Sequence, residues 1–188
     1  QSTNPDTLRA VGRQGDYRAL AQGVEALMDA DRIHIHLDLI AGLPLEDYES
    51  FRLSFNDAYR LRPHHLQLGF LKLLPGTPLQ EEAETYGYIY RRRPPYEVIA
   101  HRHLSARALV RLKMVEKVLD LYYNRGGFQA TLDYGTTALA DDPFGFYEEL
   151  ADFYTLKGYH HRPHAKDDLY RILRAYGCWK DRAVPGAS

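Results

Sequence analysis

Two apolar, strand-like runs near the start of the chain, each preceded by a helical segment, constrain its fold most strongly. The runs cover 33–40 and 65–73, and the first stops at the breaker Gly42-Leu43-Pro44. Helices are predicted over 16–29 and from the N-cap Asp47 to about residue 62. Strands joined through a helix lie parallel, with a right-handed crossover. We therefore expect an α/β unit in which the first run is buried on both faces.

Both predicted helices carry apolar side chains at helical spacing, which we expect to face the sheet. These side chains are Leu20, Val24, Leu27 and Met28 in the first helix, and Phe51, Phe55 and Ala58 in the second.

The pattern changes after about Tyr88. The run Arg91-Arg92-Arg93-Pro94-Pro95 has the composition of a basic linker, and no convincing strand follows it. Ser105 is a predicted N-cap for a long helix that ends near Asn124, before Gly126-Gly127. Further helices are expected near 128–139, 143–157 and 165–176, with Pro143 in a first turn and Gly158 and Gly177 just past two ends. The predicted domains are 1–88, an α/β unit, and 89–188, an all-α helical domain.

Composition restricts the partners and the compartment. The 188 residues carry a formal net charge of -1, which gives no general attraction to nucleic acid or to a membrane surface. No apolar run is long enough to span a bilayer. Cys178 is the single cysteine, which excludes an internal disulfide and favours a cytoplasmic location.

An α/β unit with parallel strands places function at the carboxyl ends of its strands. Asp38 lies in the first apolar run, among Leu37, Leu39 and Ile40. A buried carboxylate is costly unless another group pairs with it. Asp38 is therefore a candidate site residue, with a structural ion pair as the alternative.

Three segments resemble the radical S-adenosylmethionine (SAM) superfamily, in the order that the family has them. Residues 38–47, Asp-Leu-Ile-Ala-Gly-Leu-Pro-Leu-Glu-Asp, resemble the fifth barrel strand and its turn, with Leu45 where glycine is commonest. Residues 63–77 resemble the sixth strand and its Pro-Gly-Thr ending, and residues 1–13 the end of the fourth strand and the next helix. The resemblance covers residues 1 to about 80. It implies the C-terminal portion of a partial TIM-type barrel.

The resemblance also implies contacts with SAM. An acid at the position of Asp38 accepts hydrogen bonds from the ribose, and an arginine at Arg13 holds the methionine carboxylate. The backbone around Gly69 and Phe70 would lie near the adenosyl group. The implied cofactor-binding residues are Gln1, Arg13, Asp38, Gly42, Gly69 and Phe70.

The helical part carries a second resemblance. Residues 122–128, Tyr-Tyr-Asn-Arg-Gly-Gly-Phe, and 143–147, Pro-Phe-Gly-Phe-Tyr, resemble the uncharacterised C-terminal region of cobalamin (B12)-binding-domain radical SAM proteins. Many of these are described as Mg-protoporphyrin IX monomethyl ester oxidative cyclase-like. The resemblance implies a parent protein that uses SAM, a [4Fe-4S] cluster and possibly cobalamin.

The chain has no Cys-x-x-x-Cys-x-x-Cys loop, and thiolates hold such clusters. We therefore expect no catalytic residue and no SAM cleavage in the isolated chain, with the missing N-terminal half of the barrel as its partner in the parent. We also expect weak SAM affinity. The strand edge at 33–40 should be exposed, and we expect either self-association across it or its burial by rearranged terminal residues. The substrate stays open.

Other functions remain as alternatives. The helical part could be a docking module for a partner or a substrate, without a catalytic role. A complete small α/β enzyme is disfavoured, because no nucleophile–base pair or phosphate loop is visible.

We interpret the histidines as structural or surface residues rather than metal ligands, and the arginine run as a solvated linker rather than an RNA-binding patch. The histidines are His34, His36, His101, His103, His160, His161 and His164.

Overall fold

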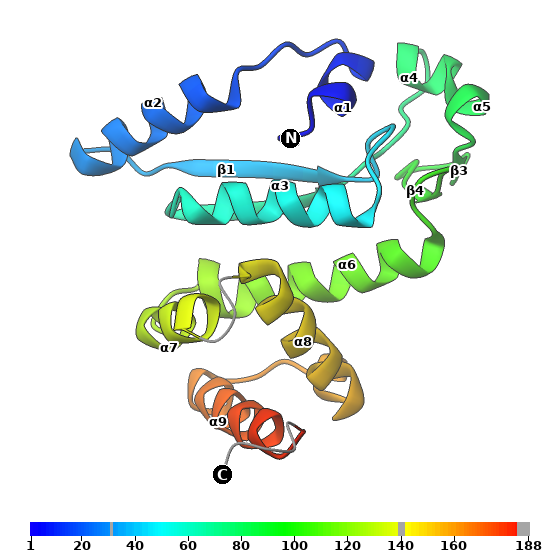
Figure 1. Ribbon diagram of the computed structural model, residues 1–188. Coiled ribbons are helices and arrows are strands. Elements are labelled where there is room, and N and C mark those ends of the chain that lie inside the picture. Colours follow the sequence, from blue (N-terminus) through cyan, green and yellow to red (C-terminus); the bar gives the residue numbers. More distant parts are fainter. Residues whose placement is uncertain (31, 139–141, 184–188) are drawn as a thin grey trace.

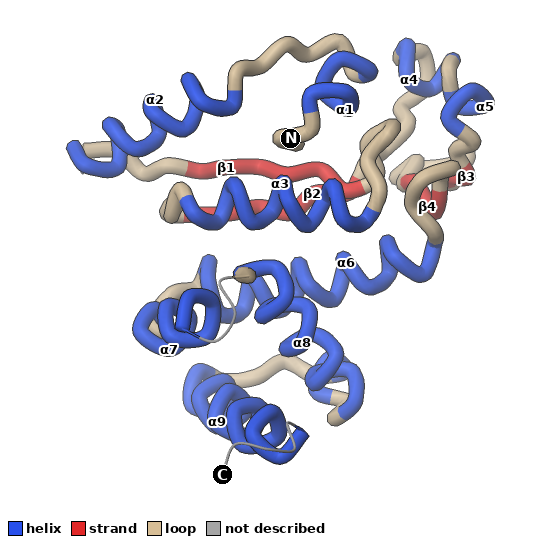
Figure 2. Tube along the Cα trace, viewed as in Figure 1, coloured by secondary structure: helices blue, strands red, loops and turns tan. Residues whose placement is uncertain are grey.

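The structure is a computed structural model that describes residues 1–30, 32–138 and 142–183. Figures 1 and 2 show a pair of strands flanked by helices and followed by a larger helical part. The α-helices are α1 (Pro5–Ala10), α2 (Tyr17–Ala30), α3 (Tyr48–Arg60), α4 (Pro78–Glu81), α5 (Ala83–Tyr86), α6 (Ala106–Leu119), α7 (Gln129–Asp133), α8 (Pro143–Leu156) and α9 (Lys166–Ala183). The strands are β1 (His36–Ala41), β2 (His65–Phe70), β3 (Ile89–Tyr90) and β4 (Val98–Ala100). Single turns of other helix types are the π-helical η1 (Asp120–Asn124) and η2 (Tyr134–Ala138) and the 3-10 turn η3 (Tyr159–His161).

β1 and β2 form the predicted parallel pair, with α3 as their connection. Asp47 caps α3 as predicted, because its side chain accepts a hydrogen bond from the backbone N–H of Ser50 at 2.8 Å. The predicted inner face of α3 is also confirmed, since Phe51, Phe55 and Ala58 are all buried. A parallel pair and a high helical content are therefore present. Two strands do not by themselves make a barrel, so the partial TIM-type barrel stays a prediction.

The prediction that β1 is buried on both faces is wrong. Leu39 and Ala41 are buried, whereas His36 and Asp38 are exposed. Successive side chains of a strand point to opposite faces, so the apolar neighbours of Asp38 do not surround it. We call the side with exposed polar groups the open face; by register it carries His36, Asp38, Ile40, His65, Gln67 and Gly69.

β1 has one edge paired with β2 and a second edge that is largely free. On this second edge the backbone N–H of Ile40 donates to the carbonyl of Gln1 at 2.9 Å. No further strand pairs there within the residues that the structure describes. Gln1 therefore makes one backbone hydrogen bond to this edge, and no strand covers the rest of it among the described residues.

The predicted apolar stripe of α2 is only partly buried. Val24 is buried against Ile35 and Leu61, whereas Leu20 and Leu27 are exposed. α2 packs against the start of β1 and the end of α3, and too little surface lies opposite the rest of its stripe. The prediction for Leu20 and Leu27 is wrong for this reason.

The second part is not all-α. β3 and β4 pair antiparallel, and the basic run of residues 91–95 is the loop between them. A two-residue strand is too short to give an alternating pattern in the sequence. The long helix is confirmed as α6 plus η1, capped by Ser105, whose hydroxyl accepts from the N–H of Ala108. Gly177 does not end a helix, because α9 continues to residue 183. Residue 139, the last of another predicted helix, lies outside the described residues.

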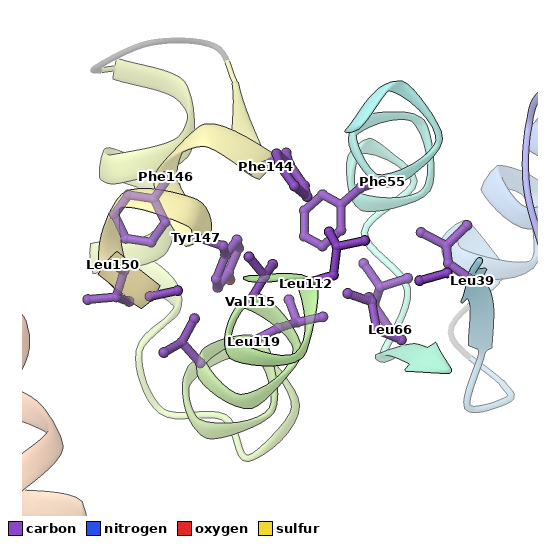
Figure 3. Close-up of a cluster of buried hydrophobic side chains, with 14 of the residues drawn as sticks. Leu39, Phe55, Leu66, Leu112, Val115, Leu119, Phe144, Phe146, Tyr147 and Leu150 are labelled. Carbon is purple, nitrogen blue, oxygen red and sulfur yellow. The ribbon is translucent and has the colours of Figure 1, made fainter. Parts of the chain in front are cut away.

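One apolar core runs from the strands into the helical part. Figure 3 shows Phe55 of α3 and Leu66 of β2 beside the α6 residue Leu112. From α8, Tyr147 packs edge-on against Phe55 with ring centroids 5.8 Å apart. The hydroxyl of Tyr147 lies 3.3 Å from that of Tyr59, which satisfies both buried polar groups. The division at residue 88 therefore crosses a shared core, and two separate domains stay a prediction.

η1 closes the outer edge of β2. The side chain of Asn124 accepts from the N–H of Leu66 and donates to its carbonyl, each at 3.0 Å. The hydroxyl of Tyr123 donates to the carbonyl of Pro63 at 2.5 Å. Asn124 thus takes both backbone groups that another strand would need, and protects the edge from strand addition. Among the described residues, no helix combines the length and apolarity needed to cross a membrane.

Candidate functional site

A hollow of about 490 Å³ lies beside β1 and brings three predicted site residues together. Gln1, Arg13 and Asp38 all line it, although they come from the N-terminal segment, the α1–α2 connection and β1. Leu8 and Leu20 add apolar surface to the same hollow. A carboxylate, a guanidinium and an amide therefore share one site.

The N-terminal segment is fixed by hydrogen bonds to α3. The backbone N–H of Thr3 donates to the Ser54 hydroxyl at 3.0 Å, and the Thr3 hydroxyl donates to Asp57 at 2.8 Å. Asn4 donates to the Ser50 hydroxyl at 2.7 Å. These bonds keep Gln1 at the edge of β1, so its position does not depend only on the hydrogen bond from the Ile40 N–H to its carbonyl.

Glu46 is a buried acid beneath this segment that was not predicted as a site residue. Its carboxylate accepts from Ser2 at 2.5 Å and from Ser54 at 3.1 Å, through the same oxygen. Within the described residues the other oxygen has no hydrogen-bond partner. Burial raises the pKa of Glu46 to about 7, against the two serine hydrogen bonds, which lower it. Glu46 therefore connects the turn after β1 to the start of the chain.

The remaining predicted residues do not line the hollow. Gly42 ends β1 in a left-handed conformation, with φ of 94°, and its carbonyl accepts from the Tyr88 hydroxyl. Gly69 lies on the open face, next to Ile40 and the backbone of Leu39. The side chain of Phe70 packs against the core, below the Nζ of Lys113. Only the backbone of Phe70 can therefore contribute to the open face.

Strand pairing brings together further side chains whose contacts were not predicted from the sequence. Gln67 is exposed and pairs in register with Asp38, so an amide stands beside the carboxylate. The His34 ring lies edge-on to that of His36 and tilted against that of His64, with centroids 5.0 and 4.5 Å away, and the His36 ring stacks on that of His65 at 4.8 Å. Register between parallel strands cannot be read from one sequence, which is why these neighbours were missed. Within the part of the chain that the structure describes, no group of three or more His, Cys, Asp or Glu is arranged to hold a metal ion.

The donor set fits some of the groups that the radical SAM resemblance implies and not others. Asp38 and Gln67 offer acceptors and donors for ribose hydroxyls, and Arg13 offers a guanidinium for a carboxylate. Gly69 leaves the open face flat beside them, which suits a planar base. An iron–sulfur cluster does not fit, because Cys178 is the single thiol of the chain and is exposed on α9.

The chain is similar to a protein family and to a curated enzyme. Residues 84–183 match a family described as a protein of unknown function, DUF4080. A segment covering 46% of the chain is 36% identical, over 94 residues, to the cobalamin-dependent radical SAM methyltransferase TokK of Streptomyces tokunonensis. That alignment covers 13% of the length of the methyltransferase. The family match includes α6, α8, the motif at 122–128 and all of α9.

Proposed function

The chain belongs to the DUF4080 family of proteins of unknown function, and we propose that it is the SAM-contacting C-terminal part of a cobalamin-linked radical SAM enzyme. The relationship to a radical SAM methyltransferase supports the general class. The observation that carries the proposal is the convergence of Gln1, Arg13 and Asp38 on one hollow at the edge of β1.

Each residue has a role in this proposal. Asp38 and Gln67 hold the ribose of SAM, and Arg13 pairs with the methionine carboxylate. Gly69 accepts the adenine against the open face. Serine hydroxyls held by Glu46 position the segment that carries Gln1. SAM supplies the methyl group or the 5′-deoxyadenosyl group, and no residue of this chain makes or breaks a bond.

The free edge of β1 supports a partner for this chain. Gln1 already accepts one backbone hydrogen bond from this edge, and the hollow continues along the same edge toward Leu37 and His36. We propose that strands of a cluster-bearing half barrel pair here, whereas Asn124 stops pairing at the opposite edge. In the isolated chain, a second copy of the chain could pair with the same edge in place of those strands.

Methyl transfer is the reaction we favour over cyclisation, because the relative that shares 36% identity is named a methyltransferase.

The isolated chain should form no 5′-deoxyadenosine from SAM, even after treatment with iron, sulfide and a strong reductant. Its lone thiol cannot hold a [4Fe-4S] cluster. The measurement is chromatography of the quenched reaction, with a radical SAM protein that has its own cysteine loop as the positive control. Any 5′-deoxyadenosine above the blank would overturn this part of the proposal.

The role of Asp38 is tested in a polypeptide that joins a half barrel with a Cys-x-x-x-Cys-x-x-Cys loop to this chain. Asp38→Asn should raise the KM for SAM by about tenfold or more, because a charge-assisted hydrogen bond to ribose is lost. Asp29→Asn at the end of α2, outside the hollow, is the matched control. Equal KM values for both variants would reject the role of Asp38.

A further inference from the structure

A second hollow lies in the helical part, remote in sequence from the proposed SAM site. It has a volume of about 430 Å³, within the usual size of small-molecule sites. One wall is the end of α6 with η1, and the other is the connection from α8 to α9. Both walls lie within the residues matched by the DUF4080 family.

Basic side chains dominate the lining of this second hollow. They are Lys117, Arg125, His160, His161, Arg162 and His164, against the two carboxylates Glu116 and Asp120. Asp120 is already paired with Arg125 at 3.2 Å. Burial, with Asp120 nearby, raises the pKa of Glu116 above its usual range. The positive charge of the lining therefore exceeds the negative charge that could neutralise it.

Three of the basic groups have structural hydrogen bonds. Lys117 donates to the carbonyl of His160 at 2.5 Å and so joins the two walls. His164 lies 2.8 Å from the carbonyl of Tyr159, and His160 lies 3.4 Å from that of Tyr154. These contacts shape the connection between α8 and α9.

Two basic groups have no such role. Within the described residues, the side chains of Arg162 and His161 have no hydrogen-bond or ion-pair partner. The His161 ring lies with its centroid 3.8 Å from that of His160. The guanidinium of Arg162 and the ring nitrogens of His161 are therefore available to a ligand that enters the hollow.

The geometry of the opposite wall also differs from an ordinary helix. Asp120 and Leu121 belong to the π-helical turn η1, and Leu121 gives the hollow an apolar side. π-helical turns inside longer helices occur frequently at functional sites. The widened turn carries Asp120 and is followed at once by Arg125.

We infer that this second hollow binds a small molecule through its phosphate or carboxylate group, with Arg162 and His161 as the anion-contacting residues. An arginine fork and an imidazole are suited to such oxyanions. This inference does not depend on the proposed function, since no residue of the SAM site lines the second hollow.

Isothermal titration with inorganic pyrophosphate, and separately with citrate, tests this site in the intact chain at low ionic strength. We expect saturable binding with a Kd of about 1 mM or tighter, weakened by added sodium chloride. Binding of pyrophosphate alone would identify phosphate as the group, and binding of citrate alone would identify carboxylate. No saturable binding of either anion up to about 10 mM would overturn the inference.

Variants locate the binding. Arg162→Gln and His161→Gln should each raise the Kd for the anion about tenfold, because each removes a hydrogen bond to it. Arg174→Gln changes an exposed arginine of α9 that does not line the hollow, and should alter the Kd less than twofold. Circular dichroism of each variant establishes that the fold is kept. Equal weakening by the control, or no weakening by either test variant, would reject the site.

Discussion

Replacing Glu46 with glutamine should raise the free energy of unfolding by about 3 kcal/mol at pH 8. Glu46 is 1% exposed, and one of its oxygens has no hydrogen-bond partner within the described residues. At pH 8 the folded chain must therefore either bury the charged carboxylate of Glu46 or keep Glu46 protonated above its pKa, and both cost free energy. Glutamine has the same shape without the charge, and the hydroxyls of Ser2 and Ser54 can turn to donate or accept.

The effect of Glu46 depends on pH in a defined direction. Its pKa is about 7 in the folded chain and 4.5 in the unfolded chain. The folded state thus binds the proton more tightly, and the stability that Glu46 contributes is complete below pH 4.5. This contribution is lost as the pH rises from 4.5 through 7. The difference between the variant and the wild type should therefore grow over this window and become constant above it.

Urea denaturation at a series of pH values measures this difference. Glu49→Gln is the matched control, because Glu49 is exposed on the first turn of α3 and should change stability by less than about 0.5 kcal/mol. A Glu46→Gln variant that is less stable than the wild type at pH 8 would contradict the assignment of Glu46 as a strained buried acid.

Replacing Asn124 with alanine should lower the free energy of unfolding by about 2–4 kcal/mol. The substitution removes both hydrogen bonds to the backbone of Leu66, a residue that is 0% exposed. A buried backbone donor and a buried acceptor would be left without partners. The loss should also open the edge of β2 to other strands.

Hydrogen exchange at the Leu66 amide gives a direct reading of this prediction. Protection of that amide should fall in Asn124→Ala, together with the urea midpoint. Gln129→Ala on α7 removes a side-chain bond to Asp133 in an exposed position, and should change stability by about 0.5 kcal/mol or less. Unchanged protection at Leu66 would show that Asn124 does not close the edge.

The starts of helices were predicted correctly where a single capping residue or proline sets them. Asp47 and Ser105 cap their helices as the sequence indicated, and Pro143 lies in the first turn of α8. Gly177 failed as a helix end because an exposed glycine inside a helix costs only about 1 kcal/mol, which the packing of α9 outweighs. Short strands such as β3 carry too few residues for a pattern.

Tertiary context decided the features that the sequence could not predict. Leu20 and Leu27 form a correct helical stripe, but the surface opposite them is incomplete. Asp38 is exposed for a related reason, since the open face carries no covering layer among the described residues. The motif of residues 122–128 was recognised, yet the contact of Asn124 with Leu66 joins positions 58 residues apart. Such pairings are invisible in a single sequence.

The candidate site was predicted in part. Gln1, Arg13 and Asp38 were named from the sequence and do line one hollow, while their contact with SAM stays a prediction. Gln67 was missed because it depends on strand register, and Glu46 because a buried acid cannot be told from a surface one by its neighbours in sequence.

NMR titration of the isolated chain with SAM is the most direct test of the proposed function, since it detects binding too weak for calorimetry. At millimolar SAM we expect amide shift changes confined to residues 1–3, 13–15, 38–42 and 67–70, and Asp38→Asn should abolish most of them. Shift changes elsewhere, or identical shifts in Asp38→Asn and the wild type, would contradict the assignment of this face to SAM.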